Sequence, residues 1–194
     1  MLTLPALVRL ECRCPYVQLE LGHTLKDFLI RSRPPLQELN LEAEFFASDE
    51  ELVHVLTLLP TLTSLTIHTS LINECMRVDS LIESLAFSTT SGSSVLSDLL
   101  PHLRTLEMDI NVESYGERVL PDPTSMLSMI TSRSSRYYVK SGGRTALNTF
   151  KFSADIPSQG TRPPAEQWRE SFNREFQASL NTLEAGGMFV RWEI

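Results

Sequence analysis

The chain of 194 residues is predicted to form an α/β solenoid, with parallel strands on one face and helices on the other. The main observation is a recurring eight-residue phrase: proline, any residue, leucine, two residues, leucine, one residue and an apolar residue. It begins at Pro5, Pro34, Pro60 and Pro101, and a copy without the proline begins at Thr145. Short strand phrases that recur between helical stretches are typical of stacked repeats.

The spacing of the copies also favours this fold. The first leucines of successive copies are 29, 26, 41 and 44 residues apart, and leucine-rich repeats have about 20–29 residues. The two longer intervals therefore hold extra loops or a degenerate repeat. Residues 81–87 keep the phrase spacing, so an extra strand there and a helix over Met76–Leu85 both remain open. We expect an irregular, leucine-rich-repeat-like (ribonuclease-inhibitor-like) solenoid.

Each phrase is expected to form one strand whose leucines point inward, because side chains alternate along a strand. Proline ends the preceding helix and has no amide hydrogen to donate, so it suits the corner between helix and strand. The residues between the leucines then face outward, on the concave side of the sheet. They are Arg9, Glu11, Arg13, Glu38, Asn40, Glu42, Ser64, Thr66, His68, Thr105, Glu107, Asp109, Thr149, Lys151 and Ser153.

Helices are expected between the strands, each with a polar start signal followed by apolar residues at helical spacing. The signals are Thr24 for a helix over His23–Arg31, the capping box Ser48–Glu51 for the run Leu52 to Leu59, and Asp122 with Pro123 for a helix over Thr124–Arg133. In a capping box the hydroxyl and the carboxylate each accept a hydrogen bond from a backbone amide. Ser97–Leu100 is expected to be a single turn.

The last part of the chain has a different pattern, which predicts a capping helix after Pro164. Large apolar residues recur there at helical spacing: Trp168, Phe172, Phe176, Leu180 and Leu183. Such a helix closes the end of a solenoid core. Gly186 and Gly187 then end it before a short strand at Met188–Trp192. We expect a single domain over residues 1–194, with irregular repeats in 4–163 and the capping helix and strand in 164–194.

The first phrase begins at Pro5, and no capping segment precedes it. An uncovered solenoid end exposes core leucines. We therefore expect the chain to be a fragment that lacks its N-terminal cap, to come from a truncated gene model, or to cover that end by association. Ser88–Ser94 is expected to be a flexible loop because of its composition. Glu113–Pro121 and Ser153–Pro163 are expected to be irregular connections.

The composition is that of an ordinary soluble globular protein, with 42% hydrophobic and 21% charged residues. The net charge of −7 argues against a general affinity for nucleic acid or an anionic membrane surface. No apolar run approaches the ~20 residues that a membrane span needs. Cys12, Cys14 and Cys75 show no disulfide spacing, which favours a reducing compartment, the cytoplasm or the nucleus.

The sequence contains no pattern that indicates an enzyme, a cofactor or a metal. Cys12 and Cys14 lack a second ligand pair, and Cys12 belongs to the inward-facing set, so a small buried hydrophobe is its expected role. The four histidines form no metal-binding unit, and Ser91–Ser94 lacks a nucleophile elbow. The basic stretch Arg133–Arg144 is expected to be a solvated loop rather than a phosphate site, given the acidic whole.

The repeat style resembles that of fungal F-box proteins with leucine-rich-repeat-like C-terminal regions. The resemblance covers roughly residues 4–153 and is carried by Phe28–Leu39, Leu58–Leu65, Leu99–Met108 and Met126–Arg133. It implies that the repeats hold a protein target, while an F-box upstream docks a cullin-type ubiquitin ligase adaptor. No segment of this chain reads as an F-box, so the adaptor is implied only if an F-box lies upstream.

The chain departs from the repeat pattern at the asparagine slot, eight residues after the first leucine. Only Asn111 fills it, and the other copies have Pro15, Glu44, Ser70 and Asp155. A regular, tightly wound horseshoe is therefore not expected.

The outward strand residues are the candidate partner-binding site, because concave repeat surfaces commonly bind proteins. A solvated sheet face without a ligand is the alternative reading of the same residues. We expect non-catalytic recognition of a protein target, as the repeat region of an F-box-type ligase receptor or, alternatively, as a free-standing scaffold without a ligase link. The candidate binding residues are Arg9, Glu11, Glu38, Asn40, Glu42, Thr66, His68, Glu107, Asp109 and Lys151.

Overall fold

Each copy of the strand phrase forms a strand, and a sixth strand follows the last helix. The structure is a computed structural model that describes residues 3–13, 21–70, 78–87, 99–111, 120–134, 145–155 and 163–194. The strands are β1 (Arg9–Cys12), β2 (Glu38–Glu42), β3 (Ser64–Ser70), β4 (Thr105–Asn111), β5 (Thr149–Asp155) and β6 (Phe189–Glu193). The helices are α1 (Leu21–Ser32), the short 3₁₀ helix η1 (Ala43–Phe45), α2 (Asp49–Thr57), α3 (Val78–Leu85), α4 (Pro123–Ser132) and α5 (Pro163–Ala185).

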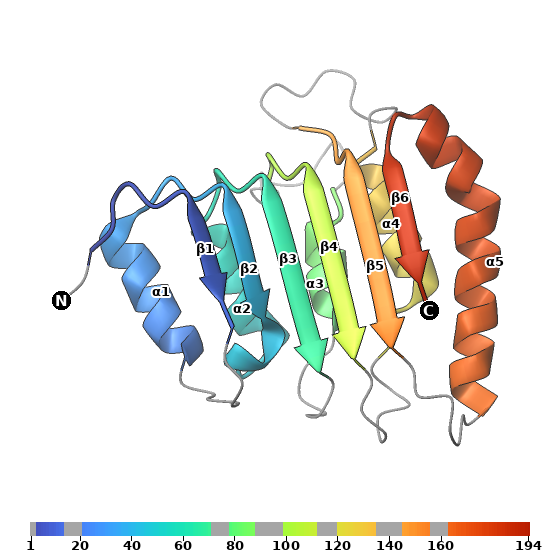
Figure 1. The fold of residues 1–194 in the computed structure, drawn as a ribbon, viewed down its shortest axis with the longest axis horizontal. Helices are drawn as coiled ribbons and strands as arrows, with labels where there is room; N and C mark the ends of the chain where they lie inside the picture. The colour runs from blue at the N-terminus through green and yellow to red at the C-terminus, as the bar shows by residue number, and fades with distance from the viewer. Residues whose placement is uncertain are drawn as a thin grey trace, which may run out of the picture.

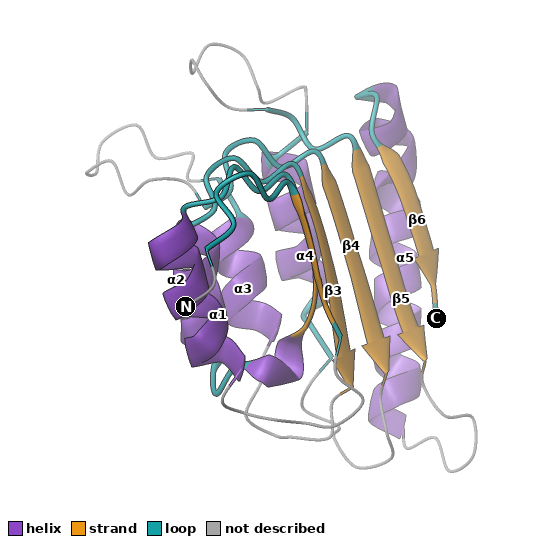
Figure 2. Ribbon diagram, turned by 60° about the vertical axis from the view of Figure 1, so that its left-hand side comes forward, coloured by secondary structure: helices purple, strands orange, loops and turns teal. Residues whose placement is uncertain are grey.

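The six strands form one open sheet in chain order, and all neighbours are parallel. The α-helices alternate with the strands and cover one face of this sheet, as Figures 1 and 2 show. The predicted parallel α/β arrangement is therefore confirmed. No helix in the described ranges has a stretch that is both long and apolar enough to cross a bilayer.

The register between neighbouring strands is the same throughout the sheet. One row of paired residues contains Leu10, Leu39, Leu65, Leu106, Phe150 and Val190. The backbone ladder begins one residue before the strands: the amide of Thr63 donates to the carbonyl of Gln37 (2.9 Å), and the amide of Arg104 donates to the carbonyl of Thr63 (2.8 Å). Since inward residues in this register stack on one another, they form a continuous core.

The helix starts agree with the sequence except in α1. Ser48 Oγ accepts a hydrogen bond from the amide of Glu51 (3.3 Å), so the predicted N-cap is confirmed. Glu51 Oε2 accepts one from the amide of Ala47 (2.8 Å), one residue before the amide that a capping box uses. Asp122 likewise accepts a hydrogen bond from the amide of Ser125 (2.8 Å) at the start of α4.

Thr24 is not an N-cap, because α1 already begins at Leu21. The first turn of this helix contains Gly22, which is buried against the next unit. A Cβ added at Gly22 would lie 2.7 Å from the backbone oxygen of Phe45 and 3.0 Å from Cδ1 of Phe46. A residue without a side chain therefore permits the close approach of α1 to η1.

Residues 81–85 are helical, which decides between the two readings of this segment. Leu81, Ile82 and Leu85 are buried on one face of α3 and belong to the core. The spacing of apolar residues in a strand phrase over so few residues is also compatible with a helix. The long interval between the third and fourth copies is therefore not filled by an extra strand at 81–87 within the described residues.

α5 closes the far end of the core with an aromatic cluster. Phe172 stacks on Phe176 with ring centroids 4.1 Å apart, and Phe152 of β5 lies 5.1 Å from Phe172. Gly187 adopts a left-handed conformation (φ 82°). The amide of Met188 donates to the carbonyl of Leu183 (3.2 Å), which completes a glycine-terminated helix end. The predicted helix end and final strand are confirmed.

Arg133 does not lie in a solvated loop, contrary to the sequence-based expectation. It follows α4 and is completely buried. Its guanidinium donates hydrogen bonds to the carbonyls of Leu85, Leu99 and Leu100, and its Cζ lies 4.0 Å from the centroid of the Phe87 ring. These hydrogen bonds from a buried cation connect the end of α3 and the turn before β4 to the end of α4.

The asparagine slot of the second copy holds a buried carboxylate. Glu44 lies in η1, and its Oε1 accepts a hydrogen bond from the hydroxyl of Thr69 at the end of β3 (3.1 Å). The side chain therefore links two neighbouring units.

Several predictions lie outside the described residues: the loop Ser88–Ser94, most of the loops Glu113–Pro121 and Ser153–Pro163, the first half of Ser97–Leu100, Cys14, Cys75 and the basic stretch beyond Ser134.

The β1 end of the core is less well covered than the rest. Leu10 and Cys12 are only partly buried, whereas their register partners Leu39 and Leu41 are buried. Val8 and Ile30 are also largely exposed at this end.

Leu65→Ala is expected to lower the free energy of unfolding by about 2–5 kcal/mol, because Leu65 is completely buried in a central strand. Thr66→Ala is the matched control, with an expected change of roughly 0.5 kcal/mol or less, since Thr66 faces away from the core. Urea unfolding followed by circular dichroism measures both. Equal losses would contradict the assigned inward and outward faces.

Gly22→Ala is expected to destabilise the fold by about 1–3 kcal/mol, because the added Cβ meets a backbone oxygen at 2.7 Å. Helix propensity alone predicts the opposite sign, a gain of about 1 kcal/mol. Asp27→Ala, at an exposed site of the same helix, serves as the control for propensity. A Gly22→Ala protein more stable than the parent in the same urea experiment would refute the close contact.

Candidate functional site

The sheet face opposite the helices carries rows of mostly polar side chains, and we refer to these rows as the open face. They arise because side chains two residues apart point to the same face and the parallel register is not shifted. The first row is Arg9, Glu38, Ser64, Thr105, Thr149 and Phe189. The second is Glu11, Asn40, Thr66, Glu107, Lys151 and Arg191. The third is Glu42, His68, Asp109, Ser153 and Glu193.

All ten candidate binding residues lie in these rows, so the structure brings them onto one surface. Neighbouring strands are about 4.8 Å apart, and six strands therefore present a face roughly 24 Å wide. The alternation of leucines in the sequence was sufficient to identify this set.

Ion pairs of arginine or lysine with glutamate cross between neighbouring strands of the described part of the sheet. Arg9 Nε lies 3.5 Å from Glu38 Oε2, and Lys151 Nζ lies 3.2 Å from Glu107 Oε2. All four side chains are more than a third exposed. Exposed pairs of this kind contribute only about 0–1 kcal/mol, so a partner can exchange them for its own charges at small cost.

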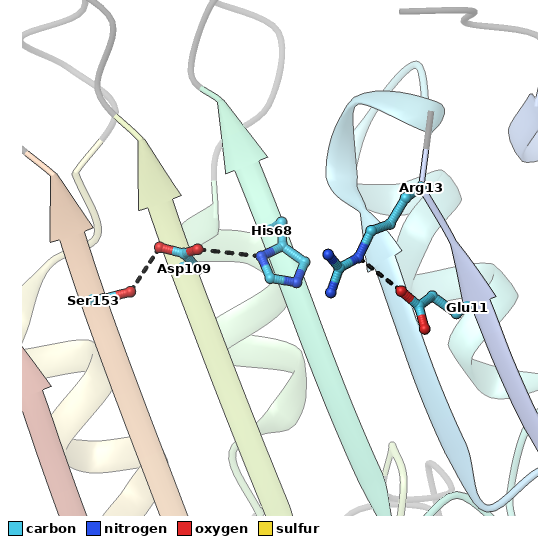
Figure 3. Close-up of polar contacts among 5 residues, drawn as sticks. All are labelled: Glu11, Arg13, His68, Asp109 and Ser153. Atoms are coloured by element: carbon cyan, nitrogen blue, oxygen red, sulfur yellow. Dashed lines mark hydrogen bonds and ion pairs between the residues drawn. The ribbon is translucent and has the colours of Figure 1, made fainter. Parts of the chain in front are cut away.

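A hydrogen-bonded chain links three central strands through Asp109. Ser153 Oγ donates to Asp109 Oδ1 (2.6 Å), and His68 Nδ1 lies 3.2 Å from Asp109 Oδ2 (Figure 3). A carboxylate only accepts hydrogen bonds, so Nδ1 of His68 carries a proton. The serine donates to the aspartate and not to the histidine. This order differs from that of a Ser-His-Asp triad, in which the histidine receives the serine proton.

Two acceptor atoms beside this chain are buried and have no hydrogen-bond partner among the described residues: Asn40 Oδ1 and His68 Nε2. Arg13 follows β1, and its side chain reaches across β2 toward the His68 ring, as Figure 3 shows. Arg13 Nε also lies 2.9 Å from Glu11 Oε1 of its own strand.

The sequence analysis missed the part of the open face that β6 contributes. Phe189, Arg191 and Glu193 complete the three rows, and Phe189 is 56% exposed. Arg191 pairs with Glu193 along the strand, with Nε 2.9 Å from Oε1. β6 does not carry the leucine phrase, and the alternation after Gly187 was the signal that could have extended the rows.

Cys12 faces the helices from the last position of β1, next to Leu41. Burial raises the pKa of its thiol above the ordinary value. This agrees with the expected role as a small hydrophobe. Among the described residues, no group of three or more His, Cys, Asp or Glu side chains is arranged to hold a metal ion.

Comparison with protein-family models, with curated proteins and with solved structures found no match for this chain.

Cys12 is expected to react several-fold more slowly with iodoacetamide at pH 8 in the folded protein than in urea, because a raised pKa reduces the thiolate fraction. The Cys14→Ser, Cys75→Ser double variant isolates this thiol. Mass spectrometry gives the alkylation rate. In the folded state, this rate is expected to keep rising at pH values above the pKa of an ordinary cysteine, because the pKa of Cys12 is raised. Equal rates in the folded and unfolded states would contradict the burial of Cys12.

Proposed function

We propose that this chain is a leucine-rich-repeat-like solenoid that binds a protein target through its open face and has no catalytic role. The observation that carries the proposal is the constant register of six parallel strands, which aligns polar side chains in continuous rows on the uncovered side of the sheet. The recurring strand phrase and the helix that follows each of the first five strands support the repeat assignment.

The chemistry of the open face suits a protein partner. Specific interfaces combine aromatic residues and arginine with a polar, exposed rim. Here Phe189 is an exposed aromatic side chain, and Arg9, Arg13 and Arg191 are distributed over the two ends of the face. The net charge of −7 argues against nucleic acid or an anionic membrane as the partner.

Within this function, the repeat style favours the target-binding region of an F-box-type ubiquitin ligase receptor in the cytoplasm or nucleus. A cullin-type adaptor is then a second partner, bound by an F-box encoded upstream and not by the open face. A free-standing scaffold without a ligase link is the alternative. Affinity purification of the full-length gene product separates the two, because only the receptor recovers the adaptor.

For the open-face variant Glu42→Lys, Glu107→Lys, Asp109→Lys, we expect the amount of co-purified target to fall at least 10-fold. Each new like-charge contact with the partner costs up to several kcal/mol of binding free energy when it is buried, and less when it is exposed. The matched control carries Glu83→Lys, Glu170→Lys, Glu184→Lys on exposed positions of α3 and α5. Quantitative mass spectrometry compares the recovered proteins, after thermal unfolding has shown that both variants are folded.

Retention of every target by the open-face variant would refute the proposed binding face. Loss of the same proteins from both variants would also count against it, because the net charge alone would then explain the effect.

A further inference from the structure

We infer that the open face binds an arginine side chain of its partner at the position that Arg13 of the same chain now covers. This inference rests on the proposed function and specifies the partner's chemistry. Arg13 directly follows β1, where Cys12 pairs with Leu41, so Arg13 is level with Glu42 of β2. Glu42 in turn pairs with His68 of β3. Figure 3 shows the Arg13 side chain reaching across β2 toward the His68 ring.

Two acceptors lie on the open face of β2 and β3, the strands that Arg13 reaches. Asn40 Oδ1 and His68 Nε2 are buried without a hydrogen-bond partner among the described residues. Nδ1 of His68 carries the proton of the hydrogen bond to Asp109, so Nε2 is the acceptor in the neutral form of the ring. Buried acceptors that lack a donor cost free energy, and a ligand that supplies donors recovers it.

The charge at this place selects a cationic donor. Glu42 and Asp109 lie on either side of His68 in the third row, and Asn40 lies two residues before Glu42 on β2. A guanidinium offers five N–H donors in one plane and serves several acceptors at once, whereas an ammonium is a compact point charge. Arginine therefore fits this group of acceptors better than lysine. Arg13 brings a guanidinium close to this place, but its Nε pairs with Glu11, and both acceptors remain without a hydrogen bond.

Arg13 is attached in a way that permits displacement. Its side chain is 58% exposed, and it lies beyond the last paired residue of β1. The ion pair with Glu11 is exposed and within one strand, so it contributes little. The partner's arginine takes this position when Arg13 moves aside.

The test is a titration of the folded chain with N-acetylarginine amide, followed by the backbone amide shifts of Asn40, Thr66 and His68 in ¹⁵N-correlated NMR spectra. We expect saturable shifts with a Kd of about 1–10 mM, tightened about two- to fivefold by Arg13→Ala. Glu42→Gln is expected to weaken binding. N-acetylcitrulline amide, which is neutral and of similar shape, is expected to produce no saturable shift.

Two controls remove the general effect of charge. Arg31→Ala makes the same charge change at an exposed site of α1, and Glu83→Gln matches Glu42→Gln on α3. Neither is expected to change the Kd. The inference is overturned if citrulline binds as well as arginine, if no shift saturates, or if Arg31→Ala tightens binding as much as Arg13→Ala does.

Failure of this titration is distinct from failure of the proposed function. If the open-face lysine variant loses its target while the arginine probe does not bind, the open face still binds the protein and only the arginine site is refuted.

Discussion

The constant parallel register is the constraint on which the rest of the structure depends. It places one inward residue of each strand beside its equivalents, from Leu10 through Leu65 to Val190, so the core is a continuous stack and not a set of separate contacts. A shift by one residue would turn each leucine to the opposite face of the sheet. The same register that builds the core therefore aligns the polar rows on the other side.

Much of the fold was predictable because its signals are local. Alternation within a strand, proline at a corner and a serine or aspartate at a helix start are each read from a few residues. Arg133 was not predictable in this way, since its partners are carbonyls of Leu85, Leu99 and Leu100, contributed by segments far away in the sequence. Residues 81–87 remained ambiguous because their apolar spacing suits a strand and a helix, and only packing decides between them.

The composition of the open face was predictable, whereas its interactions were not. The ten expected residues follow from which side of a strand they occupy, a property of the sequence alone. Which of them bond to one another depends on the register between strands and on side-chain reach. The bridge that Asp109 forms between His68 and Ser153, and the path of Arg13 across β2, are therefore visible only in three dimensions. These interactions also show that the charges of the face are partly neutralised internally, so its binding properties differ from those of a list of free side chains.

The two ends of the sheet are unequally protected. At one end, α5 packs Phe172 and Phe176 over the last strands, while at the other Leu10 and Cys12 are only partly buried and one edge of β1 pairs with no described strand. Local opening in proteins begins where few apolar contacts oppose it. Amide hydrogens of β1 should therefore exchange with solvent through fraying at a far lower free energy than those of β4 and β5. Disassembly of the native state then has a direction, from the first strand toward the aromatic end.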